Sequence, residues 1–339
     1  MTKRSLAVYG LAHFWMDLSC AFLLFRALSG GGQWMLCLLL YNFCAFAMQM
    51  PLGLLADRWD RNGLTAAIGC VLTAVACVPP LPLLTAALAG TGNALFHLGG
   101  GIDVLNASGE RAAALGVFIS PGALGLYIGT IWGRSAAPRL GLAPLGLLLM
   151  AALILRHCPK TGRALHSGNA PLDLTAPQGY GAILPLFLVV VLRSYMGMNQ
   201  SFPWKSQWAL ILTLALVLGK TAGGFLMDGF GSRRASGMSL GLAAALYLAS
   251  ALPLTGTLAV FLFNMTMPIT LWAAARMLPG AKGFAFGLLT FALFLGYLPS
   301  YLGWPSLLVS PAAYACAALL SLVLLWFGLG KEAEPCWQS

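Results

Sequence analysis

Charged residues are scarce in this chain. Asp, Glu, Lys and Arg together make up 8% of 339 residues, and nine of them are acidic. A soluble domain carries about a quarter charged residues, whereas this chain is 59% apolar with a mean hydropathy of +0.84. The composition excludes an ordinary soluble domain and predicts a polytopic membrane protein. The formal charge of +10 comes from basic residues scattered singly between apolar runs, so no basic stripe suggests nucleic-acid binding.

Signatures of enzymes are missing as well. The sequence has no Walker motif, no dinucleotide-binding fingerprint, no His-Glu-x-x-His and no nucleophile elbow, so an ATP-driven pump or a membrane hydrolase lacks its parts. The eight cysteines show no metal-ligand spacing, and most lie in apolar runs, where a buried thiol behaves as a small hydrophobic group. We therefore expect no enzyme activity, no cofactor, no metal and no disulfide framework.

Long apolar runs dominate the chain instead. A bilayer core needs about 20 apolar residues per helix, and this criterion gives twelve candidate spans. They are residues 5–28, 33–56, 63–79, 80–104, 112–134, 137–156, 180–200, 206–228, 235–252, 256–279, 283–302 and 308–329. One connection, 157–179, is long, polar and rich in Pro and Gly, which is typical of a linker. We predict an all-α membrane protein with two six-helix halves (1–156 and 180–330), this linker, and a tail at 331–339.

The basic residues also predict the orientation of the chain. With a cytoplasmic N-terminus, fourteen Lys and Arg lie on the inside. Four lie outside: Arg26, Arg134, Arg139 and Lys205. This bias follows the positive-inside rule. We therefore expect an inner-membrane protein with the linker and both termini in the cytoplasm.

A short charged turn occurs twice, half a chain length apart, each time between two apolar runs. Its residues are Gly53, Asp57, Arg58 and Arg61 in the first copy, and Gly224, Asp228, Arg233 and Arg234 in the second. This repeat resembles the loop signature of the major facilitator superfamily, which lies between the second and third helices of each half. The resemblance covers essentially the whole chain. It implies twelve helices in two halves and a gating role for the six charged residues of the repeat; simple turn chemistry is the alternative for Asp57.

Three ionisable residues stand out in the first and seventh apolar spans. His13 and Asp17 are four residues apart on the first span, and Arg193 interrupts the seventh. Ionisable groups inside a membrane are costly and usually face a cavity. In a transporter built from two parallel repeats, the first helices of the two repeats meet beside the central cavity. We expect Asp17 to pair with Arg193 and to be the proton-coupling group, with His13 tuning it and Arg193 binding substrate. A permanent structural ion pair is the alternative.

Other polar residues in the spans have two readings each. Asn42 and Asn264 are candidates for substrate binding, or they hold helices together through hydrogen bonds. His97 and Asp103, near the end of the fourth span, are candidates for a gate or a proton relay, or they form ordinary interhelical hydrogen bonds.

A narrower resemblance rests on four islands of sequence. Residues 12–17, 90–99, 192–194 and 267–288 look like the fosmidomycin-resistance branch of the superfamily, which implies drug export. Three positions depart from the expected pattern: Leu98 replaces a proline, Thr130 replaces the proline of an antiporter glycine-proline pair, and Asp60 replaces the turn glycine. The second departure weakens the prediction of drug antiport and leaves the transporter prediction intact.

The sequence therefore predicts a secondary transporter that acts by alternating access. Our leading hypothesis is proton-coupled export of a small organic compound, with an anionic one favoured by Arg193. Uptake of a sugar or another metabolite is one alternative, and a membrane sensor or scaffold without flux is another. The expected partners are a small-molecule substrate, protons and the lipid bilayer, without nucleic acid, and the chain is expected to act as a monomer.

Overall fold

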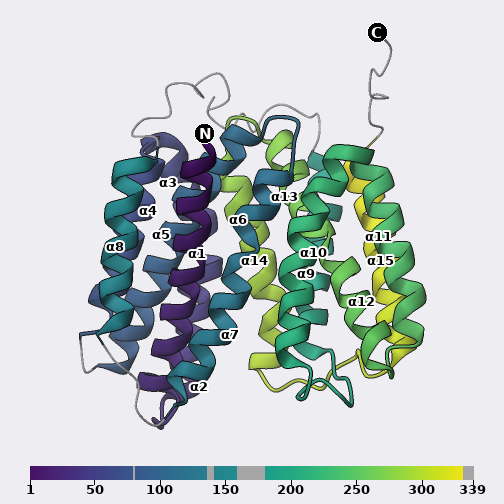
Figure 1. Cartoon of the computed structure of the whole chain (residues 1–339), viewed down its shortest axis with the longest axis horizontal. Coiled ribbons are helices and arrows are strands. Elements are labelled where there is room, and N and C mark those ends of the chain that lie inside the picture. Colours follow the sequence, from purple (N-terminus) through teal and green to yellow (C-terminus); the bar gives the residue numbers. More distant parts are fainter. Residues whose placement is uncertain (79–80, 136–140, 159–179, 331–339) are drawn as a thin grey trace. The chain divides into compact units, whose positions relative to one another are not determined.

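The computed structural model describes residues 1–78, 81–135, 141–158 and 180–330 (Figure 1). All regular elements among these residues are helices. The first six spans are α1 Lys3–Leu23 with the π-helical turn η1 Leu24–Leu28; α2 Trp34–Asn42, η2 Phe43–Ala47 and α3 Gln49–Trp59; α4 Asn62–Val75; α5 Pro82–Ser108; α6 Ala113–Ile119 with α7 Pro121–Gly133; and α8 Leu142–His157.

The second six spans follow in the same manner. They are α9 Tyr180–Asn199; α10 Ala209–Phe230; α11 Ser232–Leu248; α12 Pro253–Asn264 with α13 Thr266–Met277; α14 Lys282–Tyr301; and α15 Pro311–Leu329. Each of the twelve predicted spans contains a helix, so the predicted all-α membrane fold is confirmed. Most of the predicted linker and the whole predicted tail lie outside the described residues, and the division into these four segments stays a prediction.

Eight helical stretches in the described part of the chain are long and apolar enough to cross a membrane. Of the other four spans, α4 and α8 are shorter apolar helices, whereas α5 and α11 carry many polar side chains. These side chains point inward: Asn93 and Asp103 of α5 are buried, and so are Ser232, Ser236 and Ser239 of α11. Polar groups that face inward lower the mean hydropathy of a helix, but they are not exposed to lipid.

Large apolar side chains cover the outer faces of several helices. Leu145 and Leu149 on α8, and Leu320 and Phe327 on α15, are each more than half exposed. Monomeric soluble proteins rarely expose apolar surface so extensively. The exposed side chains are those expected of helix faces in contact with lipid.

The helices group into two compact units that do not follow chain order. Unit 1 comprises the described residues within Met1–Gly109, Val117–Leu172 and Leu278–Phe294, and unit 2 comprises those within Glu110–Gly116, Asp173–Met277 and Leu295–Ser339. Each unit therefore includes a short segment from the other half of the sequence. In unit 1, α1 packs against α7 and α8, and α4 packs against α5; in unit 2, α15 packs against α9 and α11.

Helices α1 and α7 approach each other closely because α7 presents a stripe of glycines. An added Cβ at Gly125 would collide with the carbonyl oxygen of Phe14, and one at Gly129 would collide with that of Leu18. Small residues four apart allow this kind of backbone contact. The Gly-x-x-x-Gly spacing thus has a packing role, and it brings the ionisable residues of α1 close to α7.

Candidate functional site

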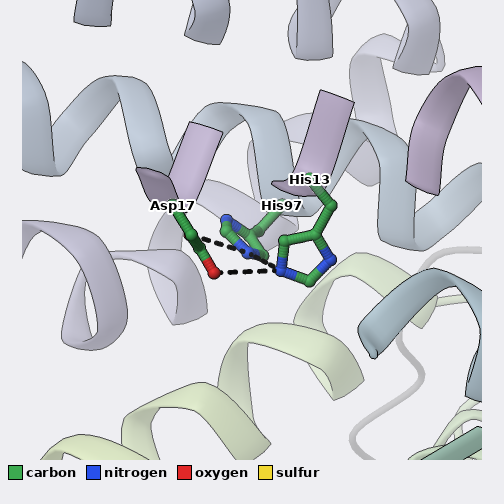
Figure 2. Close-up of side chains that lie close together, drawn as sticks. All are labelled: His13, Asp17 and His97. Atoms are coloured by element: carbon green, nitrogen blue, oxygen red, sulfur yellow. Dashed lines mark hydrogen bonds and ion pairs between the residues drawn. The ribbon is translucent and has the colours of Figure 1, made fainter. Parts of the chain in front are cut away.

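Two helices of unit 1 each carry a polar pair with the spacing of one helical turn. His13 and Asp17 lie on α1, and Asn93 and His97 lie on α5. Residues four apart share a helix face, and the packing of α1 against α5 brings the two pairs together. Figure 2 shows His13, Asp17 and His97 pointing toward one another. We call these three residues with Asn93 the histidine–aspartate cluster.

Asp17 is the acidic member of this cluster. Its Oδ2 lies 3.2 Å from Nε2 of His13, and its Oδ1 lies 3.8 Å from Nε2 of His97. The side-chain amide of Asn93 donates to Oδ1 at 3.1 Å. The carboxylate therefore has a neutral donor and two imidazoles as neighbours.

The two histidines are held by backbone carbonyls and by each other. Nδ1 of His13 lies 2.7 Å from the carbonyl oxygen of Phe118, and Nδ1 of His97 lies 2.9 Å from that of Asn93. The two Nε2 atoms are 2.9 Å apart. The His13 side chain is buried, with the rings of Phe96 and Phe118 at 6.1 and 5.2 Å between centroids. Both rings are thus fixed in orientation, with their Nε2 atoms directed at the same point.

Gly122 of α7 closes the cluster from a third side. A Cβ at this position would collide with Nε2 of His13 and with Oδ2 of Asp17. Only glycine leaves room for both side chains here, because it has no Cβ.

Arg193 occupies a separate site in unit 2. Its guanidinium Nη2 donates to the hydroxyls of Thr270 at 2.8 Å and Thr266 at 3.2 Å, both on α13. The side chain is buried, and its Nε has no hydrogen-bond partner. No described carboxylate of unit 2 forms an ion pair with Arg193, since Glu110 pairs with Arg276 and Asp228 accepts from backbone N–H groups.

The two charged turns cap helix N-termini. Asp57 accepts hydrogen bonds from the N–H groups of Gly283 at 2.7 Å and Phe284 at 2.9 Å, at the start of α14. Asp228 accepts from those of Ala112 at 2.6 Å and Ala113 at 3.3 Å, at the start of α6. The first N–H groups of a helix have no partner within it and attract negative charge. Asp57 and Asp228 thus occupy equivalent positions, each at the N-terminus of another helix.

Three of the four arginines of these turns lie at the surface, and Arg233 is partly buried. Arg58, Arg61 and Arg234 are exposed, and Arg233 donates to the carbonyl oxygen of Trp326 at 3.5 Å. Between the first pair of arginines, Asp60 ends α3 with φ 49° and ψ 37°. It is the one residue other than glycine with positive φ in the described chain, whereas the second turn has Gly231 with φ 82°.

The remaining predicted residues have local partners. Asp103 accepts from the hydroxyl of Tyr9 at 2.6 Å and from the amide of Asn62 at 2.9 Å, all three side chains being buried. Asn42 and Asn264 each donate to a carbonyl four residues earlier in their own helix. Asp103 thus bonds to side chains of α1 and α4, whereas His97 belongs to the histidine–aspartate cluster.

From the sequence, His97 was grouped with Asp103. The threonine partners of Arg193 were not predicted. The missed signal for His97 was the repeated i, i+4 spacing of polar residues on α1 and α5. Asp17 and Arg193 belong to different units, and their predicted pairing stays a prediction.

The chain resembles known transporters in its structure rather than in its sequence. By sequence, no protein-family model and no curated protein matches the chain. By structure, it is similar to the E. coli fucose:proton symporter FucP (TM-score 0.64, 16% identity, covering 95% of this chain and 97% of that one). It is also similar to the human organic anion transporter MFSD10 (0.68, 16%, 96% and 99%) and to the proton:xylose symporter XylE (0.66, 13%, 96% and 95%). The chain has the major facilitator fold.

These three major facilitator structures cover nearly the whole chain, so the likeness extends over all twelve spans. At 13 to 16% identity it concerns the fold alone. The resemblance to the superfamily inferred from the charged turns agrees with it.

Proposed function

We propose that this chain is a secondary transporter that moves a small organic anion across the membrane by alternating access, coupled to proton movement. The buried guanidinium of Arg193 carries this proposal. A buried cation needs an anionic partner. Within unit 2 the described partners of Arg193 are two hydroxyls, and its own Nε has no hydrogen-bond partner. A carboxylate or phosphonate would fit the planar donor fork of arginine. The human organic anion transporter among the similar structures supports the same substrate class.

Proton coupling is assigned to the histidine–aspartate cluster. Asp17 and His13 are the groups proposed to bind and release the coupling proton, because imidazole and carboxylate are the ionisable side chains at this depth in α1. Two of the similar structures are proton symporters by their descriptions. A sensor or scaffold would have no need for ionisable groups buried in both units.

Export is the direction that the resemblance to the fosmidomycin-resistance branch favours, by proton antiport. Uptake by proton symport is the second candidate, which the similarity to FucP and XylE favours. In both cases Asn42 and Asn264 are proposed to contribute to substrate binding, and Asp103 with His97 to gating.

The charged turns are proposed to act as gates. The carboxylates of Asp57 and Asp228 each lie at a helix N-terminus. A carboxylate in this position stabilises one arrangement of the helices that it joins. Arg58, Arg61, Arg233 and Arg234 are proposed to support the gates and to fix the topology, with both termini in the cytoplasm of an inner-membrane monomer.

A transport assay in proteoliposomes tests the proposal. Small carboxylates, phosphonates and matched neutral compounds are offered with and without an imposed pH gradient. We expect accumulation of an anionic compound that depends on the gradient, and the sign of the gradient then distinguishes antiport from symport. Gradient-independent movement of neutral compounds alone would overturn the anion and the proton assignments, and no movement of any compound would favour a sensor.

A further inference from the structure

The two histidines of the cluster face each other in a way that neutral imidazoles do not allow. A carbonyl oxygen has no hydrogen, so the Nδ1 atoms of His13 and His97, which lie against the carbonyls of Phe118 and Asn93, must each donate one. A neutral imidazole has a single N–H. Both Nε2 atoms would then be acceptors, yet they lie 2.9 Å apart, which is a hydrogen-bond distance.

One added proton resolves this conflict. We propose that His13 and His97 bind a single shared proton between their Nε2 atoms, with Asp17 as its counter-ion, and that this is the proton that His13 and Asp17 take up and release during transport. The lone pair of one Nε2 takes up the proton, which then forms an N–H···N hydrogen bond to the other. The cation carries one positive charge, and the Asp17 carboxylate beside both Nε2 atoms neutralises it. Release returns the same proton to water and breaks no other bond.

Asp17 is the carboxylate in direct contact with the pair. On α1 the facing titratable groups are Asp17 and, against Asn93, the thiol of Cys20; Tyr9 directs its hydroxyl at Asp103 instead. On α5 the pair is faced by the amide of Asn93. On α6 and α7 it is faced by the Phe118 carbonyl and by Gly122, neither of which titrates. Asp17 is therefore the counter-ion of the shared proton.

A proton fits this site better than a metal ion does. The ligand atoms of His13, Asp17 and His97 lie within 4.8 Å of one another, close enough for a cation to bridge them. Two nitrogen ligands about 2.0–2.1 Å from a tetrahedral zinc ion lie about 3.4 Å apart, whereas the Nε2 atoms are 2.9 Å apart. The observed separation is that of a hydrogen bond between the rings.

This inference rests on the proposed function for its link to transport, but the shared proton itself can be observed without any flux. The chain has four histidines, so ¹⁵N-histidine NMR of the full chain in lipid nanodiscs is tractable. We expect one N–H···N correlation between two Nε2 atoms near neutral pH, lost in His13→Asn and in His97→Asn, and retained in His157→Asn as a matched control. Asp17→Asn should also lose it, because the buried cation would have no counter-ion.

The stoichiometry gives a second, independent measurement. Titration of the wild-type chain between about pH 5 and pH 8 should show the two rings changing together with uptake of one proton, as coupled groups do. Two rings that titrate separately would overturn the proposal, as would two neutral rings throughout that range. A spectrum that changes on adding one equivalent of zinc chloride and reverts with chelator would overturn it in favour of a metal site. A shared proton without transport would overturn the proposed function and leave the proton site intact.

Discussion

Asp57 Oδ1 accepts a hydrogen bond from the backbone N–H of Gly283 at 2.7 Å. These residues are 226 positions apart in the sequence, and both belong to unit 1. Since Oδ2 accepts from the next N–H, that of Phe284, the carboxylate satisfies two of the donors that the start of α14 leaves without partners.

We predict that Asp57→Asn lowers the transport rate about tenfold while membrane insertion is unchanged. An amide has one acceptor oxygen and no charge, so one N–H of α14 loses its partner and the helix terminus loses about 0.5–2 kcal/mol of stabilisation. Initial rates in proteoliposomes measure this effect. Lys3→Gln, at an exposed position outside the two charged turns, is the control and should stay near the parent rate. Undiminished transport by Asp57→Asn would exclude the gating role.

Substrate affinity should depend on the shape of the cation at position 193. Arg193→Lys keeps the charge but loses the planar fork, so we expect the apparent KM for an anionic compound to rise about tenfold, which corresponds to about 1.4 kcal/mol. Arg193→Gln should abolish binding. If the Gln variant binds the anion as well as the parent does, Arg193 is a structural partner of Thr266 and Thr270 only.

Replacement of Asp17 should separate coupling from exchange. Without the carboxylate, the cluster has no negative charge to hold a proton at this depth in the membrane, so Asp17→Asn should lose accumulation driven by a pH gradient. Counterflow of substrate between the two sides needs no net proton movement and should persist. Accumulation equal to that of the parent would place the coupling group elsewhere, with Asp103 the next candidate.

A methyl group at position 122 should disable the same cluster from the opposite side. Gly122→Ala places a Cβ against Nε2 of His13 and Oδ2 of Asp17, which forces the side chains apart. We expect loss of gradient-driven accumulation with normal expression. The control is Gly241→Ala on α11, where an added Cβ meets no atom within 4 Å. Equal transport by the two variants would show that the cluster tolerates displacement.

Asp60 offers a test of backbone strain. Its φ of 49° lies in the left-handed region, which costs a residue with a Cβ roughly 1–2 kcal/mol and suits glycine. Asp60→Gly should therefore raise the free energy of unfolding by about 1 kcal/mol, seen as a higher melting temperature in detergent. Asp60→Ala is the matched control and should not raise it. A lower melting temperature for the Gly variant would mean that interactions of the Asp60 side chain outweigh the strain.

The fold was predictable from the sequence because lipid constrains it so strongly. Backbone groups in a bilayer must be satisfied within a helix, so apolar runs such as 206–228 and 308–329 correspond closely to α10 and α15. Breaks inside a span were not predictable from hydropathy. The turn at Ser120 between α6 and α7 and the one at Met265 between α12 and α13 leave the apolar run uninterrupted.

The candidate site was only half predictable. Ionisable residues in apolar runs stand out, so His13, Asp17 and Arg193 were found directly. Their partners depend on helix packing and on rotation about each helix axis, which no single span records. His97 therefore looked like a neighbour of Asp103 along α5, although it faces α1. Nothing in the sequence distinguishes Thr266 and Thr270 from other helix residues, and only the structure shows that their hydroxyls accept from the guanidinium of Arg193.

The segment Leu278–Phe294 belongs to unit 1 although it follows most of unit 2 in the chain. Domains generally fold as units during synthesis, the N-terminal one first. Here that order cannot be followed, because unit 1 is complete only after residue 294 has left the ribosome. Until then the Asp57 carboxylate has no Gly283 to accept from. The N-terminal helices of unit 1 therefore remain without part of their native contacts until a segment synthesised near the end of translation is available.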